Sequence, residues 1–212
     1  MDVEETPSAA AISVTSAMYD SDDEGCSSYA DDDNANAPPG EPLVSNVAGY
    51  LNRELYDWGL TDHLRRIFGF EEFRDNQLEV CKNTLLGKDS LVVMATGSGK
   101  SIMYQLPAVA LRGLGLACTT IVVSPLLSLI EDQVLGLRAK GIAAGRITGS
   151  SSRQEEDAAR KGDYVLLYTT PEKIVMWKDG LKELMLHASI VCIAVDEAHW
   201  YIIYHNPDIR HF

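Results

Sequence analysis

The feature that most constrains the fold of this chain is the alternation of short apolar runs with amphipathic stretches after residue 89. The runs are rich in β-branched residues and hydrophobic throughout, as is typical of strands buried on both faces of a sheet. This alternation predicts an α/β fold in which helices cover both faces of a parallel sheet. The expected strands are Ser90–Val93, Thr119–Val123, Gly145–Thr148, Tyr164–Tyr168 and Ile190–Val195, and the expected helices are Lys100–Arg112, Leu127–Lys140, Arg153–Lys161 and Glu172–His187.

The charge of the chain, formally −13, is concentrated near the N-terminus. Residues 1–52 hold eleven of the 31 acidic residues and none of the 18 basic residues. Residues 1–42 also have few large apolar side chains, so we expect them to form a disordered acidic tail. A helical lead-in over 43–88, with helices at 47–57 and 60–68, then precedes one domain over 89–212. Because the body is nearly neutral, the overall acidity does not exclude nucleic acid as a partner.

The cysteines and the apolar runs limit the class of protein. The four cysteines form no CxxC pair, which argues against a zinc ribbon or a disulfide framework and suits a reducing compartment. The N-terminus lacks a basic start with a long apolar stretch, and no run approaches the roughly 20 apolar residues of a membrane span. We therefore expect a soluble intracellular protein with no membrane partner.

The strongest motif is a glycine-rich run that follows an apolar strand and begins a helix, the context of a phosphate-binding loop. Gly97 and Gly99 let the backbone curl so that several N–H groups point at one anion, and Lys100 places an ammonium on the outer phosphates. A Gly/Ser turn is the alternative, and Met94 replaces the usual first glycine. No third glycine supports a dinucleotide site. The candidate ATP contacts are Met94, Ala95, Thr96, Gly97, Ser98, Gly99, Lys100 and Ser101.

An acidic motif, Asp196-Glu197-Ala198-His199, ends the last apolar strand. Acids at the carboxyl end of a parallel strand lie on the rim where such sheets bind ligands. We expect Asp196 and the Ser101 hydroxyl to bind Mg²⁺, and Glu197 to orient and deprotonate the attacking water. Helix capping is an alternative role for the acids. It does not explain the second acid, His199 and the upstream loop together, so a nucleoside triphosphatase is favoured, with Lys100, Asp196, Glu197 and His199 as catalytic candidates.

These motifs resemble those of superfamily 2 helicases and, more narrowly, of the RecQ family. The phosphate loop and the Asp-Glu-Ala-His motif carry the superfamily. The segment Phe68–Gln77 is similar to the adenine-recognition motif F-G-x-x-x-F-R-x-x-Q of RecQ proteins. The resemblance implies that Gln77 reads the adenine edge and that Arg74 and Phe70 stack on the base. Core packing is the alternative for the aromatic residues of this segment.

Further stretches extend the resemblance over Asp62–His199. Tyr104–Ala108 follows the loop as in the family, Val123–Val134 resembles motif Ia and Tyr168–Lys173 resembles motif Ib. The resemblance implies that the last two face the DNA backbone, although their hydroxyl residues are equally suited to capping helices. The candidate DNA contacts are Ser124, Ser128, Thr169, Thr170 and, by stacking on a base, Trp200.

The resemblance implies a RecA-like domain and a 3′-to-5′ ATP-dependent DNA helicase of the nucleus, with ATP and Mg²⁺ as cofactors and single-stranded or forked DNA as partner. The segment after His199 departs from the family's aromatic-rich loop. The family's second RecA-like domain, with its arginine finger, does not occur in the 212 residues. Because such a finger contributes about 10³–10⁵ in rate, we expect the isolated chain to bind Mg-ATP weakly, hydrolyse it slowly and not unwind DNA.

Two other readings stay open: a superfamily 2 RNA helicase fragment, and a truncated ATP- or DNA-binding module without catalysis. A metal site at His199, His205 and His211 is disfavoured, because a spacing of six residues is not usual for ligands.

Overall fold

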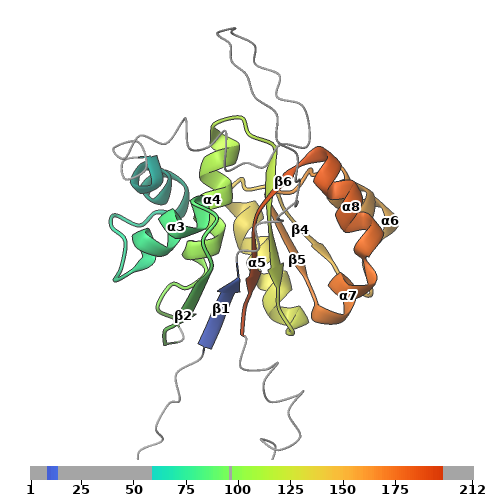
Figure 1. The fold of residues 1–212 in the computed structure, drawn as a ribbon, viewed down its shortest axis with the longest axis horizontal. Helices are drawn as coiled ribbons and strands as arrows, with labels where there is room; N and C mark the ends of the chain where they lie inside the picture. The colour runs from blue at the N-terminus through green and yellow to red at the C-terminus, as the bar shows by residue number, and fades with distance from the viewer. Residues whose placement is uncertain (1–8, 14–58, 96, 198–212) are drawn as a thin grey trace, which may run out of the picture.

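The computed structural model describes residues 9–13, 59–95 and 97–197. In these residues helices flank a sheet of six strands, in the order β2-β1-β6-β3-β5-β4 (Figure 1). The strands are β1 (Ala9–Ser13), β2 (Ser90–Val93), β3 (Cys118–Val123), β4 (Ala144–Ile147), β5 (Leu166–Thr169) and β6 (Ser189–Val195). The helical elements are η1 (Leu64–Phe68), α3 (Gln77–Leu85), α4 (Ile102–Gly113), α5 (Leu127–Ala139), α6 (Arg153–Arg160), α7 (Pro171–Met176) and α8 (Lys178–His187).

The sheet contains the parallel arrangement that the sequence predicts. Strands β6, β3, β5 and β4 pair in parallel, as strands joined by helical crossovers must. All five predicted strands are present, each within two residues of its expected bounds. The predicted α/β fold is therefore confirmed. No helix among the described residues has the length and apolar content needed to cross a bilayer.

The structure corrects the expectation for part of the acidic tail. Ala9–Ser13, within the segment expected to be disordered, forms β1 and pairs antiparallel with both β2 and β6. The prediction relied on the scarcity of large apolar side chains, whereas this strand is held by backbone pairing on both of its edges. The other tail residues, and the helix expected at 47–57, lie outside the described residues.

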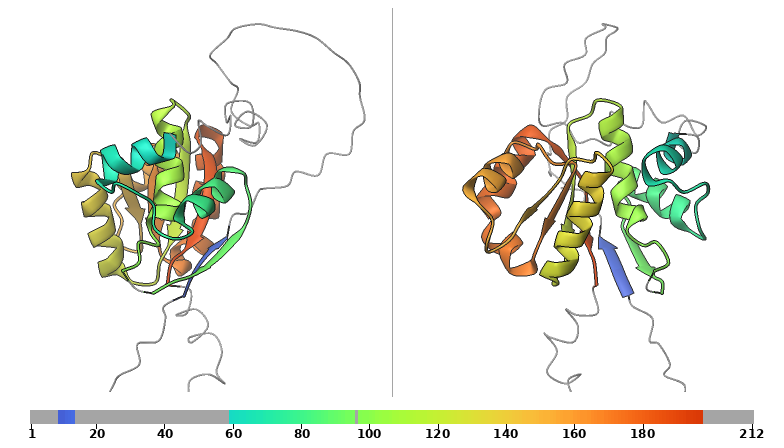
Figure 2. Two further views of the ribbon diagram at one scale, coloured as in Figure 1. Left: turned by 90° about the vertical axis from the view of Figure 1, so that its left-hand side faces the viewer. Right: turned by 180° about the vertical axis from the view of Figure 1, so that it is seen from behind.

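Helices cover both faces of the sheet (Figure 2). On one face α3, α4 and α5 pack on the sheet through a large cluster that includes Leu106 of α4 and Val122 of β3. On the other face α6, α7 and α8 pack through a smaller cluster that includes Ile121 of β3 and Leu184 of α8. The alternation of Ile121 and Val122 follows the two-residue period of a strand. Cys81, Cys118 and Cys192 are free thiols buried in the first cluster.

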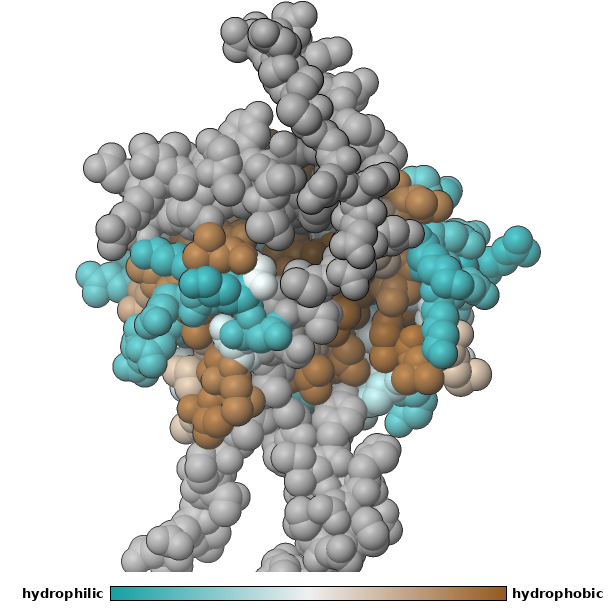
Figure 3. All heavy atoms as spheres, in the orientation of Figure 1, coloured by the Kyte–Doolittle hydropathy of each residue, from teal (hydrophilic) through white to brown (hydrophobic). Residues whose placement is uncertain are grey.

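One face of β2 remains open in the described part of the chain. Leu91 is 77% and Val93 59% exposed, while Val92 between them is buried. Figure 3 shows hydrophobic side chains gathered at the lower left, where Figure 1 draws β2. Helical cover is therefore complete over the parallel strands and incomplete at β2.

A helix expected over Glu172–His187 is interrupted at Trp177, which separates α7 from α8. The Trp177 side chain is 4% exposed, and a Cβ at Gly180 would overlap its indole. The Arg160 guanidinium lies 5.6 Å from the ring centroid, within cation–π range. Burial of the indole therefore accompanies the bend, while the apolar spacing continues across it and predicts a single helix.

Candidate nucleotide-binding site

The predicted phosphate loop joins β2 to α4, as its context in the sequence indicates. Gly97 has φ 79° and Gly99 has φ 89°, a left-handed region in which side chains with a Cβ are strained. The Ser98 hydroxyl donates to the Ala95 carbonyl at 2.6 Å and fixes the turn. The two glycines thus have the conformation that their role in the loop requires.

Lys100 lies inside this loop. Its side chain is 9% exposed, and its Nζ donates to the carbonyls of Met94 and Ala95, at 3.1 Å each. A buried ammonium needs such partners, because burial without hydrogen bonds is costly. The loop therefore holds the cation in place through neutral carbonyl oxygens.

Gln77 connects the predicted adenine motif to the same loop. Its Nε2 donates to the Gly99 carbonyl at 3.0 Å, and its Oε1 accepts from the Arg74 backbone N–H at 2.8 Å. The side chain is 4% exposed, whereas Arg74 is exposed and Phe70 is 47% exposed. The structure thus places Gln77 against the loop and joins the Arg74 backbone to it, whereas Phe70 and Arg74 are exposed.

The other aromatic residues of the motif have a structural role. Phe68 is buried in the large cluster, and Phe73 packs against it half-buried. Core packing, the alternative left open for these two rings, is what the structure shows.

Asp196 follows β6 and is 7% exposed. Its Oδ1 accepts from the Glu197 backbone N–H at 3.0 Å, and its Oδ2 accepts from the Tyr104 hydroxyl at 3.1 Å. Burial raises the pKa of Asp196, and the two hydrogen bonds and the charge of Lys100 oppose that rise. The carboxylate is therefore held in a fixed orientation in surroundings that make its charge costly.

Glu197 has a left-handed backbone, with φ 54°. A non-glycine residue in this region costs on the order of 1–3 kcal/mol and is most frequent at functional sites. The backbone N–H of Glu197 donates to Asp196 Oδ1, so the second acid of the motif helps to orient the first.

The phosphate loop and the acidic pair converge in space. Tyr104 lies in the first turn of α4, directly after the loop, and its hydroxyl bonds Asp196, 92 residues away in the sequence. The Tyr104 backbone N–H donates to the Ser101 carbonyl at 3.4 Å. Ser101, Lys100 and Asp196 thus share one region at the carboxyl ends of β2 and β6. The sequence analysis gave Tyr104 no role, although it noted the stretch Tyr104–Ala108.

Three of the predicted DNA-contacting residues lie on the same edge of the sheet as Asp196. The Asp196 backbone N–H donates to the Val123 carbonyl, and the Ser124 backbone N–H donates to the Thr169 carbonyl, at 2.9 Å each. The carboxyl ends of β6, β3 and β5 are thereby aligned in a row. Ser124 and Thr169 are buried, and Thr170 follows Thr169. Ser128 is exposed in the first turn of α5.

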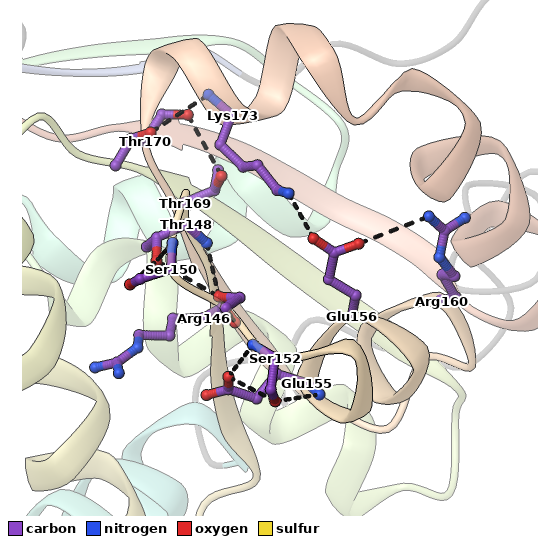
Figure 4. Close-up of polar contacts among 11 residues, drawn as sticks. Arg146, Thr148, Ser150, Ser152, Glu155, Glu156, Arg160, Thr169, Thr170 and Lys173 are labelled. Atoms are coloured by element: carbon purple, nitrogen blue, oxygen red, sulfur yellow. Dashed lines mark hydrogen bonds and ion pairs between the residues drawn. The ribbon is translucent and has the colours of Figure 1, made fainter.

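The hydroxyl row continues onto the end of β4, which the sequence analysis did not single out (Figure 4). The hydroxyls of Thr148 and Ser150 are 3.2 Å apart, and the Thr148 backbone N–H donates to the Ser151 hydroxyl at 2.8 Å. Ile147 of β4 pairs with Thr169 of β5, so this cluster neighbours the end of β5. A Thr-Gly-Ser-Ser run at a strand end was the available signal.

The basic residue next to Thr170 in this region, Lys173, is paired within the protein. Lys173 donates to Glu156, which also lies 3.8 Å from Arg160 (Figure 4). Thr170 caps α7 by accepting from the Lys173 backbone N–H at 3.3 Å. Capping, the alternative role for Thr170, is therefore present in the structure.

The remaining predicted residues, Thr96, His199 and Trp200, lie outside the described residues. The same holds for the disfavoured metal site at His199, His205 and His211. Among the described residues no group of three or more His, Cys, Asp or Glu converges on one point. A pair of oxygen ligands such as Ser101 and Asp196 suits Mg²⁺, which keeps several waters and takes further ligands from phosphates.

Comparison with known proteins agrees with this geometry. A model of the DEAD/DEAH box helicase family matches residues 74–211. ATP-dependent DNA helicase RecQ of Pasteurella multocida is 43% identical over 142 residues, which cover 65% of this chain and 21% of that protein. ATP-dependent DNA helicase Q-like 2 of Arabidopsis thaliana is 43% identical over 177 residues, covering 77% of this chain and 24% of that protein. RecQ-like DNA helicase blm-1 of Caenorhabditis elegans is 45% identical over 137 residues, which cover 62% of this chain and 13% of that protein.

The chain therefore belongs to the DEAD/DEAH box helicase family. Within that class the relatives identify it as part of a RecQ-family helicase, which confirms the resemblance. Two of these relatives are named ATP-dependent DNA helicases. The chain spans about a quarter or less of the length of these relatives.

Proposed function

We propose that this chain binds Mg-ATP at the carboxyl edge of its sheet and is the ATP-hydrolysing lobe of a 3′-to-5′ DNA helicase. The observation that carries the proposal is the contact between Tyr104, at the end of the phosphate loop, and Asp196. That contact brings an anion-binding loop and a pair of acids to one place. Those are the parts that phosphoryl transfer to water requires.

The phosphates are bound by the loop and its lysine. The backbone N–H groups around Gly97 and Gly99 face the anion at the N-terminal end of α4. The Lys100 ammonium, now on the Met94 and Ala95 carbonyls, exchanges them for the outer phosphates. The electrostatic attraction on the ammonium then increases strongly, because neutral carbonyl acceptors are replaced by anionic phosphates in a buried setting.

Ser101 and Asp196 supply the oxygen ligands for Mg²⁺. When bound, the ion neutralises charge on the outer phosphates. Glu197 follows Asp196 directly and has a left-handed backbone, and its carboxylate orients the attacking water and accepts its proton. His199 remains a catalytic candidate that follows this pair in the sequence.

The base is bound on the side of the adenine motif. Phe70 and Arg74 expose a ring and a guanidinium for stacking. Gln77 reads the adenine edge by exchanging one of its bonds to the loop backbone, so base recognition changes the support of Gly99. The Gln77 amide thus takes part both in adenine recognition and in the support of the loop.

DNA is bound along the row of strand ends. Ser124, Ser128, Thr169 and Thr170 contact the phosphate backbone, which gives affinity without sequence preference. Trp200 stacks on a base. The substrate is single-stranded or forked DNA and the location is the nucleus, as the eukaryotic relatives suggest. The isolated 212-residue chain binds Mg-ATP weakly and does not unwind DNA.

Binding of a fluorescent ATP analogue to the 212-residue chain tests the proposal. We expect saturable binding that Mg²⁺ strengthens and that is lost in Lys100→Ala, because the buried cation is the main charge partner of the phosphates. Lys140→Ala removes an exposed lysine at the end of α5 and is the matched control. Equal binding by the wild type and Lys100→Ala would contradict the proposed site.

The activity of the lobe is measured by release of phosphate, with single-stranded DNA or RNA added. DNA stimulation supports the proposed substrate, whereas stimulation by RNA alone would favour an RNA helicase. Nucleotide binding without any turnover would favour a module that lacks catalysis.

A further inference from the structure

Tyr104 lies at the centre of the nucleotide site yet belongs to none of the groups assigned above. Its side chain is 1% exposed, and its hydroxyl donates to Asp196 Oδ2 at 3.1 Å. Burial raises the pKa of Tyr104 well above its usual value, and the nearby Tyr168 and Asp196 add to that effect. The hydroxyl therefore keeps its proton and acts as a neutral donor.

The other proposed Mg²⁺ ligand, Ser101, lies directly before α4, and the Tyr104 backbone N–H donates to its carbonyl at 3.4 Å. Tyr104 thus bridges the start of α4, directly after the phosphate loop, and the acid at the end of β6.

A second layer of buried polar groups surrounds Tyr104. Gln105, its neighbour in α4, donates to the Tyr168 hydroxyl and to Gln133 Oε1, at 2.9 Å each. Burial raises the pKa of Tyr168, so its hydroxyl also keeps its proton. Buried networks in which the members satisfy one another are rigid, because breaking any bond leaves a polar group without a partner.

The chemistry of Asp196 explains the need for such a bridge. Its Oδ1 is oriented by the Glu197 backbone, so Oδ2 needs a separate donor to fix the plane of the carboxylate. A cationic donor there would neutralise the charge that attracts a metal ion. A neutral phenol orients the carboxylate and leaves its charge available.

We propose that Tyr104 is a positioning residue for Mg²⁺ binding: its hydroxyl holds Asp196 in a fixed orientation beside Ser101 and the phosphate loop. The inference rests on the proposed function, since it assigns those two residues to the ion. Tyr104 itself contacts neither nucleotide nor metal.

The test is a Mg²⁺ titration of fluorescent ADP-analogue binding to the 212-residue chain, in wild type and Tyr104→Phe. The variant is expected to need about tenfold more Mg²⁺, the effect of one hydrogen bond to a charged group. Its binding without Mg²⁺ should remain unchanged. Tyr164→Phe, which removes a hydroxyl from a ring packed on the opposite face of the sheet, is the matched control.

Asp196→Asn separates a positioning role from a structural one. In that background the metal ligand is gone, so adding Tyr104→Phe should change the Mg²⁺ dependence no further. A Tyr104→Phe midpoint within about twofold of wild type would overturn the inference. So would an equal loss of binding with and without Mg²⁺. Failure of the wild type to bind nucleotide at all would overturn the proposed function as well.

A second measurement needs no loss of the hydroxyl and covers the case in which Tyr104→Phe does not fold. With 3-fluorotyrosine placed at position 104, the ¹⁹F resonance should shift on Mg²⁺ addition with the midpoint of the binding titration. A resonance that stays unmoved at saturating Mg²⁺ and nucleotide would refute the bridge.

Discussion

Gly99→Ala tests the contact between the adenine motif and the phosphate loop. At φ 89° an alanine is strained by roughly 1–2 kcal/mol. Its Cβ would also lie 2.6 Å from Gln77 Nε2, so the amide must move and give up its bond to the Gly99 carbonyl. Loss of that bond in a buried setting adds about 1 kcal/mol. The expected destabilisation is therefore about 2–3 kcal/mol, a large part of the roughly 5–15 kcal/mol of a typical domain.

Two other glycines separate these contributions. Gly141, after α5, has φ 76° but open space around its Cβ position, so Gly141→Ala should show the backbone strain alone. Gly136, inside α5, has open space and no positive φ, so Gly136→Ala should stabilise by about 0.5–1 kcal/mol. Urea denaturation of the three variants gives their free energies of unfolding, and the difference between Gly99→Ala and Gly141→Ala measures the contact.

The Gln77→Ala background provides the decisive comparison. Without the amide, the extra cost of Gly99→Ala over Gly141→Ala should vanish, because the alanine then has nothing to displace. If the two glycine variants are equally destabilised in the wild-type background, Gln77 does not support the loop. The suggestion that base recognition changes the loop would then lose its basis.

Three further outcomes are expected from urea denaturation. Burial raises the pKa of Asp196, so over the pH range between its ordinary pKa and its raised pKa the folded state holds a proton that the unfolded state has lost. The free energy of unfolding should therefore fall as the pH rises through that range. Asp196→Asn should remove this pH dependence and be more stable than the wild type at pH 7. Ser152→Ala should cost about 1 kcal/mol, because Ser152 and Glu155 form a capping box on α6, whereas Ser128→Ala at the uncapped α5 should stay within about 0.5 kcal/mol. Ala11→Pro should destabilise the chain by at least about 1 kcal/mol, since proline removes a backbone donor from a strand paired on both edges; an unchanged midpoint would argue against β1.

The sequence predicts the parallel part of the fold because its strands correspond to short apolar or β-branched runs in the sequence. Ile190–Val195 is apolar along its whole length and Thr119–Val123 is β-branched throughout; in the structure Thr119–Val123 is fully buried and Ile190–Val195 is buried or half-buried. The short Ala-rich strand β1 has no such record. Its pairing depends on two strands more than 70 residues away, so composition alone could not locate it.

The candidate site divides in the same way. The phosphate loop and the acidic pair are local motifs, and their residue types follow from the chemistry of phosphates and Mg²⁺. The contacts that join them are tertiary. Tyr104 stands in an apolar helix where an aromatic residue predicts core packing, and only the fold places its hydroxyl on Asp196. Gln77 likewise has a motif position, but its bond to Gly99 depends on the packing of α3 beside α4.

Hydroxyl residues at strand ends show most clearly what a sequence leaves undecided. Ser124 and Thr170 are the same kind of candidate, a small hydroxyl between a strand and a helix, and the sequence makes capping and phosphate contact equally suitable for both. In the structure the Thr170 hydroxyl accepts from the Lys173 backbone and caps α7. The Ser124 hydroxyl is buried and, among the described residues, has no hydrogen-bond partner. Because a buried polar group without a partner is costly, Ser124 has the stronger physical reason to gain one from a bound phosphate.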